Sequence, residues 1–219
     1  MIFFTVMVVS VSLRAYRDLS RPEAWDYWKD QYLSPSLSSS VIATPDIASA
    51  GHPRSALAVS GRIGPAAASW LRGQLDDAHL AAGDLVLLSS PGGDLGQAII
   101  IGEIIRARGL STAVGTADAA GHLRPAHCAS ACVIAFAGGT TRYGVAGSAL
   151  GVHRFVTTAP ARDPVAETQR VAGLVLGYMT RMGVSSRVVE AMSATSEIRW
   201  LDAGEALAMS LVTAPIGPR

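Results

Sequence analysis

The sequence predicts an α/β fold with a mostly parallel sheet and helical cover. Short apolar segments alternate with helical segments from Ala56 onward, and this alternation is typical of parallel sheets. After its first residue the run Asp84–Leu88 (DLVLL) is wholly apolar, as in strands that are buried on both faces. Apolar residues make up 49% of the 219 residues and charged residues 16%, so the chain has enough apolar side chains for a sizeable core.

The first segment, Ile2–Leu13, is an apolar run without charge. Its dozen residues fall short of the roughly 20 that a membrane-spanning helix needs. No basic residue precedes the run, whereas Arg14 and Arg17 follow it. We interpret residues 1–21 as a truncated export signal or membrane anchor, which predicts a protein of the cell envelope, periplasmic or membrane-anchored. A buried helix or strand is the alternative.

Residues 22–55 are predicted to form an amphipathic helix and a linker. The helix covers Pro22–Leu33, with Trp25, Trp28 and Tyr32 at helical spacing on one face. Such a face suits a membrane interface, a neighbouring subunit or the core of its own domain. Residues 34–55 are rich in Ser, Pro, Ala and Gly and have no periodicity, which predicts a linker.

Residues 56–219 are predicted to form a single folded domain. The expected strands and helices follow one another in the order of a wound α/β fold. We expect strands at residues 57–59, 84–88, 111–114, 142–143 and 151–154, and helices at about residues 65–79 and 95–107.

A glycine-rich loop, Pro91-Gly92-Gly93, joins one of these strands to the helix after it. Such a loop is a good place for a group of backbone N–H donors. It is not a phosphate-binding loop, because neither a Gly-Lys-Ser/Thr nor a Gly-x-Gly-x-x-Gly pattern is present. Taken alone, the loop is more often structural.

Five motifs in order resemble the ClpP family of serine peptidases, in the ClpP/crotonase superfamily that also includes signal peptide peptidase A. They are LAVSGRI, LVLLSSPGGDLGQA, HCASACVIAFAGG, TTRYGVAGSALGVHRF and WLDAGEALAMSLV, and together they extend from Leu57 to Val212. The resemblance implies a ClpP/crotonase-like fold, preceded here by the apolar segment and the amphipathic helix.

The resemblance also implies the site residues. It places the nucleophile at Ser130, the base at His153 and the oxyanion donors at the backbone N–H groups of Gly93 and Ala131. A serine at a helix start lies near unpaired N–H groups, which favour a developing oxyanion. A neutral imidazole is the usual base for a serine hydroxyl. The structural alternative is a capping serine and a buried histidine.

The chain departs from the family at the third triad member. The family has an Asp directly before the Arg-aromatic-Leu segment, and this chain has Ile198 there. Glu197 is the expected replacement, since it is one residue away, and Ser196 is two residues away. The other alternative is a Ser–His dyad without an acid.

The two cysteines, Cys128 and Cys132, have no further cysteine beside them for a zinc site. The two alternatives for this pair are two small buried side chains and a local disulfide. Cysteines four apart within a helix rarely have good bridging geometry, but the bridge is feasible if Cys128 precedes the helix.

The resemblance implies a serine endopeptidase that cleaves peptide or protein substrates through an acyl-enzyme, without a metal or organic cofactor. It also implies homo-oligomers, and residues 2–13 are a predicted site of membrane association. A net charge of +1 without a basic cluster argues against nucleic-acid binding. The alternatives are a catalytically inactive ClpP-like scaffold and, ranked last, acyl-CoA chemistry on the same fold.

Overall fold

A six-stranded sheet organises the computed structural model, which describes residues 2–43, 55–118, 120–155 and 163–216. The strand order is β1-β2-β3-β4-β8-β11. All neighbours are parallel except β1 and β2, which are antiparallel. The predicted α/β fold with a mostly parallel sheet is therefore confirmed. The strands are β1 (Leu37–Ile42), β2 (Ala56–Gly61), β3 (Leu85–Ser89), β4 (Ser111–Val114), β8 (Arg142–Val145) and β11 (Ala214–Ile216).

A second sheet of three short strands lies against the first. Its order is β10-β9-β7, with β7 (His127–Ala129) parallel to β9 (Ala149–Val152) and β10 (Arg199–Leu201) antiparallel to β9. A bridge between Ser90 and Cys128 joins it to the segment after β3. Because β7 and β9 are parallel, their carboxyl ends meet at one edge. A two-stranded hairpin, β5 (Thr116–Ala117) and β6 (Leu123–Arg124), is separate.

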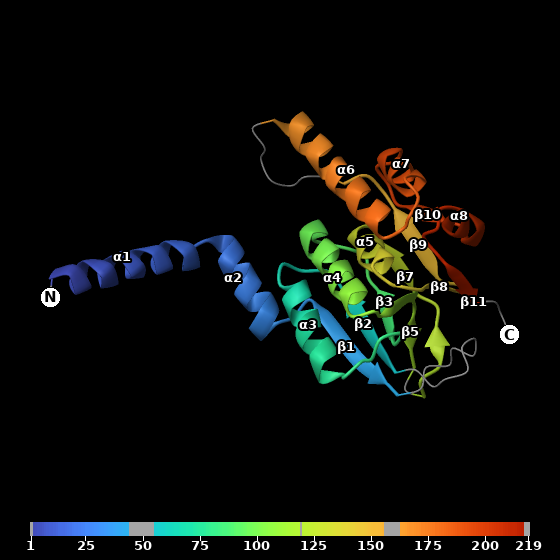
Figure 1. Cartoon of the computed structure of the whole chain (residues 1–219), viewed down its shortest axis with the longest axis horizontal. Helices are drawn as coiled ribbons and strands as arrows, with labels where there is room; N and C mark the ends of the chain where they lie inside the picture. The colour runs from blue at the N-terminus through green and yellow to red at the C-terminus, as the bar shows by residue number, and fades with distance from the viewer. Residues whose placement is uncertain (1, 44–54, 119, 156–162, 217–219) are drawn as a thin grey trace.

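Helices cover these sheets. Helices α3 (Ala67–Asp77) and α4 (Leu95–Ala107) lie side by side on the main sheet, and α5 (Ala131–Ala137) packs against α4 (Figure 1). Helices α6 (Pro164–Arg181) and α7 (Arg187–Ser193) pack together at the far side of α5 from α3 (Figure 1). The short helix α8 (Ala203–Ala208) follows β10 and begins with a capping box of Asp202 and Glu205.

Glycines let α4, α5 and α6 approach closely. A Cβ on Gly102 of α4 would overlap the hydroxyl of Tyr178, and a Cβ on Gly138 would overlap the Gly102 backbone. The Tyr178 hydroxyl donates to the Ile134 carbonyl at 2.9 Å inside this contact. Burial raises the pKa of Tyr178 well above its usual value of 10. Helix α5 is thus fixed from two sides, and every side chain in it is buried.

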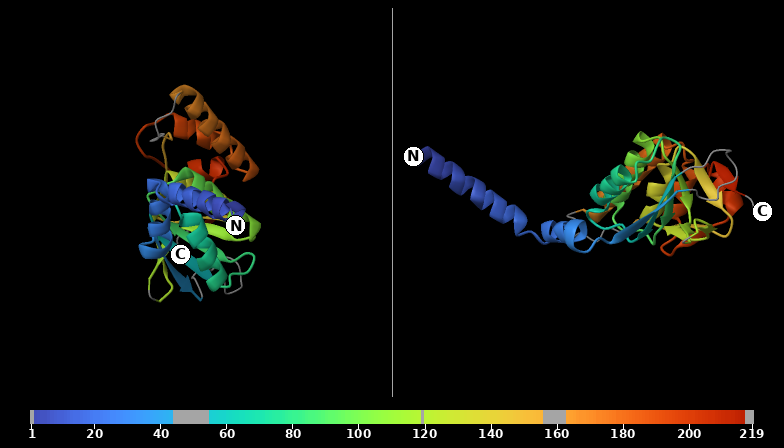
Figure 2. Two further views of the ribbon diagram at one scale, coloured as in Figure 1. Left: turned by 90° about the vertical axis from the view of Figure 1, so that its left-hand side faces the viewer. Right: turned by 90° about the horizontal axis from the view of Figure 1, so that it is seen from below.

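The amino-terminal helix α1 (Ile2–Leu19) extends away from the domain (Figure 2). Its apolar side chains from Phe3 to Leu13 are exposed in this single chain, unlike those of a buried core helix. Among the described residues no helix is both long and apolar enough to cross a membrane. The predicted aromatic helix appears as α2 (Pro22–Trp28) followed by a π-helical turn, η1 (Lys29–Leu33).

The aromatic face of this helix is exposed rather than packed in the core, as shown by Trp25, Trp28 and Tyr32. One residue of the turn does anchor it to the domain. The buried carboxylate of Asp30 accepts the backbone N–H groups of Ser36 and Ala66 at 2.8 and 2.9 Å. The amino-terminal segment is therefore connected to the domain through a buried polar contact.

The linker predicted for residues 34–55 needs a correction. Residues 37–42 form β1, which pairs along its whole length with β2. Leu37 and Ile42 are buried, whereas Ser38 and Ser40 between them are not. The composition of this segment is dominated by serines that face solvent on an edge strand. Composition alone therefore does not reveal that Leu37 and Ile42 are buried. The remainder of the predicted linker, residues 44–54, lies outside the described residues.

Candidate active site

Ser130 lies at a sharp turn between β7 and α5. Its backbone has φ 57° and ψ −126°, a conformation that suits glycine and costs a residue with a Cβ about 1–3 kcal/mol. Its N–H donates to the Gly151 carbonyl of β9 at 2.9 Å. A strained serine between a strand and a helix is the geometry of the nucleophile elbow in serine hydrolases.

The glycine-rich loop packs directly against this turn. Ser90 bonds to both ends of β7, because its N–H donates to the His127 carbonyl and its carbonyl accepts the Ala129 N–H, both at 3.0 Å. Gly92 has φ 100°, and a Cβ there would lie 2.7 Å from Ser130 Cβ and 3.0 Å from the Ala131 nitrogen. Only glycine lets the loop come this close.

Two backbone N–H groups are available beside Ser130. In the bridge to Gly93, Ile63 bonds to the Gly92 carbonyl and the Asp94 N–H at 2.9 and 2.8 Å. The N–H of Gly93 therefore faces away from Ile63, and it has no acceptor among the described residues. The N–H of Ala131 belongs to the first helical residue of α5, where no carbonyl of the same helix is within reach.

His153 follows the carboxyl end of β9, at the same sheet edge as Ser130. Its Nδ1 lies 2.7 Å from the carbonyl oxygen of Arg154. Because a carbonyl only accepts, Nδ1 carries the proton and Nε2 of the neutral ring is left as a proton acceptor. No hydrogen bond joins His153 to Ser130 within the described part of the chain.

Ile198 and His153 lie just beyond the paired residues of β10 and β9. The antiparallel register ends at the pair Arg199 and Val152, and Ile198 and His153 are the next residue on each side. The side chains of Ile198 and Trp200 lie where a Cβ on Gly151 would be. Gly151 and His153 are two residues apart, and side chains two apart along a strand point to the same face, so Ile198 and Trp200 lie on the His153 side of the sheet.

Glu197 is exposed and lies in a turn, where its backbone N–H donates to the Thr195 hydroxyl at 3.2 Å. No hydrogen bond from its carboxylate to His153 is present among the described residues. Ser196 is likewise exposed. An orienting role for either residue stays a prediction.

Cys128 and Cys132 form a disulfide with their Cα atoms 5.3 Å apart. Cys128 lies in β7, before the helix starts, and Cys132 in the first turn of α5. Both side chains are completely buried. The sequence left open whether the cysteines are free buried side chains or a local disulfide, and the structure contains the disulfide. Ser130 lies midway between the two cysteines in the sequence.

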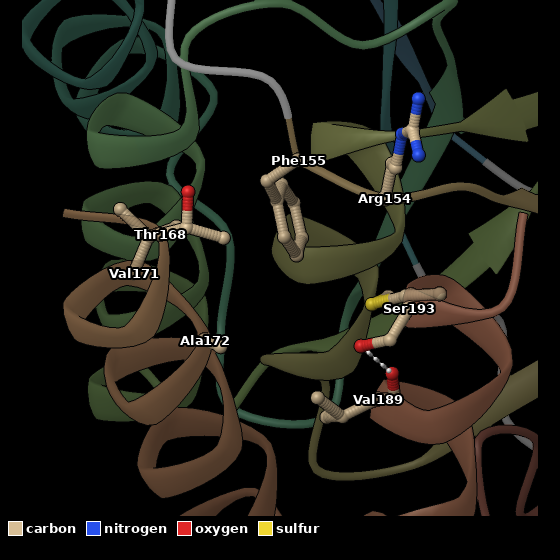
Figure 3. Close-up of a pocket in the computed structure, with 8 residues that line it drawn as sticks. Arg154, Phe155, Thr168, Val171, Ala172, Val189 and Ser193 are labelled. Carbon is tan, nitrogen blue, oxygen red and sulfur yellow. Dashed lines mark hydrogen bonds between the residues drawn. The ribbon is translucent and has the colours of Figure 1, made fainter. Parts of the chain in front are cut away.

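A pocket of about 160 Å³ lies beyond His153, between α6 and α7. Figure 3 shows the Phe155 ring pointing between the two helices and Ser193 on α7, where the Ser193 hydroxyl donates to the Val189 carbonyl at 2.9 Å. The lining is mainly apolar and comes from Arg154, Phe155, Thr168, Val171, Ala172, Val189, Met192 and Ser193. The sequence analysis missed this pocket, although apolar residues at helical spacing on both helices were a usable signal.

The geometry of the two sheets is found in known proteases. A point mutant of ClpP1 from Listeria monocytogenes aligns with a TM-score of 0.55 at 16% identity, over 72% of this chain and 88% of that one. The ClpP protease catalytic domain from Plasmodium falciparum aligns with a TM-score of 0.52 at 18% identity, over 72% and 82%. The chain has a ClpP-like fold. No protein-family model and no curated protein sequence matches it.

The ClpP-like fold predicted from the five motifs is therefore confirmed, whereas a relation to signal peptide peptidase A stays a prediction. At these identities the likeness concerns the fold alone. No group of three or more His, Cys, Asp or Glu side chains arranged for a metal ion occurs in the part of the chain that the structure describes.

Proposed function

We propose that this protein is a serine peptidase with Ser130 as nucleophile and His153 as general base. The observation that carries the proposal is the strained backbone of Ser130, at φ 57° in a strand-to-helix turn. Backbone strain of this kind is concentrated at active sites and ligand-binding sites. In addition, the N–H groups of Gly93 and Ala131 lie next to this turn without an acceptor among the described residues. A serine that only capped a helix would need neither feature.

The proposed reaction proceeds through an acyl-enzyme. His153 Nε2 takes the hydroxyl proton as Ser130 Oγ attacks the carbonyl carbon of the scissile bond. The N–H groups of Gly93 and Ala131 hold the resulting oxyanion. His153 then protonates the leaving amine, and a water molecule repeats the sequence to release the acid.

We further propose that His153 is oriented by the Arg154 carbonyl rather than by an acid. The bond from Nδ1 to this carbonyl supplies the tautomer that a triad aspartate otherwise fixes. Ile198 contributes no acceptor. The pair would therefore act as a dyad, and a carbonyl dipole stabilises the charged ring less than a carboxylate does.

The pocket beyond His153 suggests the substrate. Phe155, Val171 and Met192 give it an apolar lining, so we propose that it receives an apolar side chain of a peptide. Its lining begins at Arg154, the residue directly after the general base, which puts the pocket within the reach of a bound peptide.

Cleavage of a peptide library by the purified protein tests the proposal, with Ser130→Ala, His153→Ala and Glu197→Ala as variants. We expect cleavage beside apolar residues, its loss in the first two variants, and less than a tenfold change in Glu197→Ala. A loss of about 100-fold or more in Glu197→Ala would assign it the orienting role and reject the dyad.

A catalytically inactive scaffold is the second candidate function. It is favoured by Ile198 at the acid position and by the missing hydrogen bond between Ser130 and His153 in the described residues. A scaffold would leave the peptide library intact in the wild-type protein and in all three variants.

We also propose that the protein self-associates and that it resides in the cell envelope. The exposed aromatic residues Trp25, Trp28 and Tyr32 are suited to cover a neighbouring copy, and a buried disulfide is typical of oxidising compartments. Sedimentation of the full chain tests the first statement, and a monomer at micromolar concentration would reject it. Thiol titration of protein from its native compartment tests the second.

A further inference from the structure

The Cys128–Cys132 disulfide closes a small ring around Ser130. The ring contains Cys128, Ala129, Ser130, Ala131 and Cys132, and the serine is its midpoint. An extended segment with this spacing would separate the two Cα atoms by about 13 Å, whereas they are 5.3 Å apart. The chain must therefore turn within the ring instead of running straight on.

The unusual backbone geometry of this turn is concentrated at one residue. Of the three residues between the cysteines, only Ser130 has a positive φ. A serine relaxes to a negative φ unless its surroundings prevent it. Hydrogen bonds fix the β7 side of the turn, because Ala129 bonds to Ser90 and Ser130 to Gly151.

On the helix side, no hydrogen bond from α5 to β7 is found among the described residues. Val133 is the nearest residue with a bond back to the turn, since its N–H donates to the Ser130 carbonyl at 3.0 Å. Besides the main chain through Ser130, the Cys128–Cys132 disulfide is the covalent connection between the first turn of α5 and the strand.

We propose that this disulfide is a positioning device that holds the Ser130 turn, and with it the hydroxyl and the Ala131 N–H, in the reactive geometry. The inference rests on the proposed hydrolase function. Without the bond, the first turn of α5 moves relative to β7 while the rest of the helix stays packed, and Ser130 adopts a negative φ. The oxyanion donor and the nucleophile then lose their alignment, for which a displacement of 1 Å costs about 100-fold in rate.

We expect the disulfide to stay oxidised in the folded protein rather than to be reduced and re-formed. Both sulfur atoms are fully buried, so a thiol reaches them only when the structure opens. In reduction, a dithiol gives two electrons and two protons to the disulfide, which yields two cysteine thiols and the cyclic disulfide of the reagent. We expect native protein to resist dithiothreitol that reduces it completely when it is unfolded.

Three variants test the proposal through the rate of covalent labelling by a fluorophosphonate. The double variant Cys128→Ala/Cys132→Ala removes the bond, and the single variant Cys132→Ala should have the same effect, because either change breaks the same bond. The matched control is Val133→Ala, which truncates the buried neighbour of Cys132 in α5 and leaves the bond intact. All are compared as folded proteins, well below their melting temperatures.

We expect labelling to slow about 100-fold in both cysteine variants and less than fivefold in Val133→Ala. Equal losses in the cysteine variants and in Val133→Ala would overturn the proposal, because lost packing would then be the cause. Wild-type rates in the double variant would overturn it as well.

A crystal structure of the double variant keeps the test independent of the chemistry. A negative φ at Ser130 supports the proposal, and an unchanged positive φ rejects it. If the wild-type protein is never labelled, the proposed function fails, and the φ of Ser130 in the variant still decides whether the disulfide holds the turn.

Discussion

Replacing Ser130 by glycine should stabilise the protein while it removes the nucleophile. The comparison is with Ser130→Ala, which keeps a Cβ at φ 57° and so keeps the strain. Relief of that strain contributes about 1–3 kcal/mol. The greater freedom of glycine in the unfolded chain offsets about 0.4–1 kcal/mol of it. We therefore expect Ser130→Gly to be more stable than Ser130→Ala by up to about 2.6 kcal/mol, with a midpoint of about 1.3 kcal/mol.

Thermal unfolding followed by circular dichroism measures this difference. In a chain of this size each kcal/mol shifts the melting temperature by about 2–4 °C, so at that midpoint Ser130→Gly should melt about 3–5 °C above Ser130→Ala. Ala135→Gly, inside the same helix at a helical φ, is the control and should lower the melting temperature. If Ser130→Gly melts below Ser130→Ala, the turn is not strained and the reasoning about a nucleophile elbow is refuted.

Three further predictions concern the surroundings of the site. Gly92→Ala should abolish labelling of Ser130 and lower the melting temperature, because the new Cβ would press on Ser130 and Ala131; labelling at the wild-type rate would contradict the contact. Ala172→Trp should fill the pocket and reduce cleavage at apolar residues at least tenfold, with labelling by a small fluorophosphonate unchanged; equal loss of both activities would show a general disturbance. The backbone N–H of His122, with the Arg124 guanidinium, lowers the pKa of Asp118 from 3.8 to about 2. Since this pKa is depressed by folding, the carboxylate stabilises the hairpin above about pH 4, and the contribution is lost as the pH falls towards 2. The protection of the His122 amide, relative to the intrinsic exchange rate at each pH, should fall over that interval and not in Asp118→Asn, and a fall only below about pH 2 would contradict the assignment.

Elements with strong patterns could be predicted from the sequence. The helix at residues 95–107 and the strand at 111–114 have the predicted bounds, since an apolar helix and a buried strand each show in residue type. The three-stranded sheet could not be found as a unit. Its strands β7 and β10 have three residues each, and the side chains of His127 and Trp200 in them are exposed. Pairing between distant segments, rather than local pattern, creates these strands.

The candidate site was predictable where a side chain carries the signal and not where the backbone does. Ser130 and His153 were found as residue types in a motif. The partner of the His153 ring, however, is the main-chain carbonyl of Arg154, and every residue has such a group. The positive φ of Ser130 could not be predicted either, because a positive φ is usually adopted by glycine and the residue here is a serine.

The account depends most on Ser130 as an activated nucleophile, and covalent modification tests this most directly. The oxidised wild-type protein and Ser130→Ala are treated with a fluorophosphonate. The mass of the intact protein is then measured by mass spectrometry, and the modified residue is located by peptide mapping. The account predicts one adduct per chain in the wild-type protein, on the peptide that contains Ser130, and none in the variant. A folded, oxidised wild-type protein that remains unmodified, or an adduct that persists in Ser130→Ala, would contradict it.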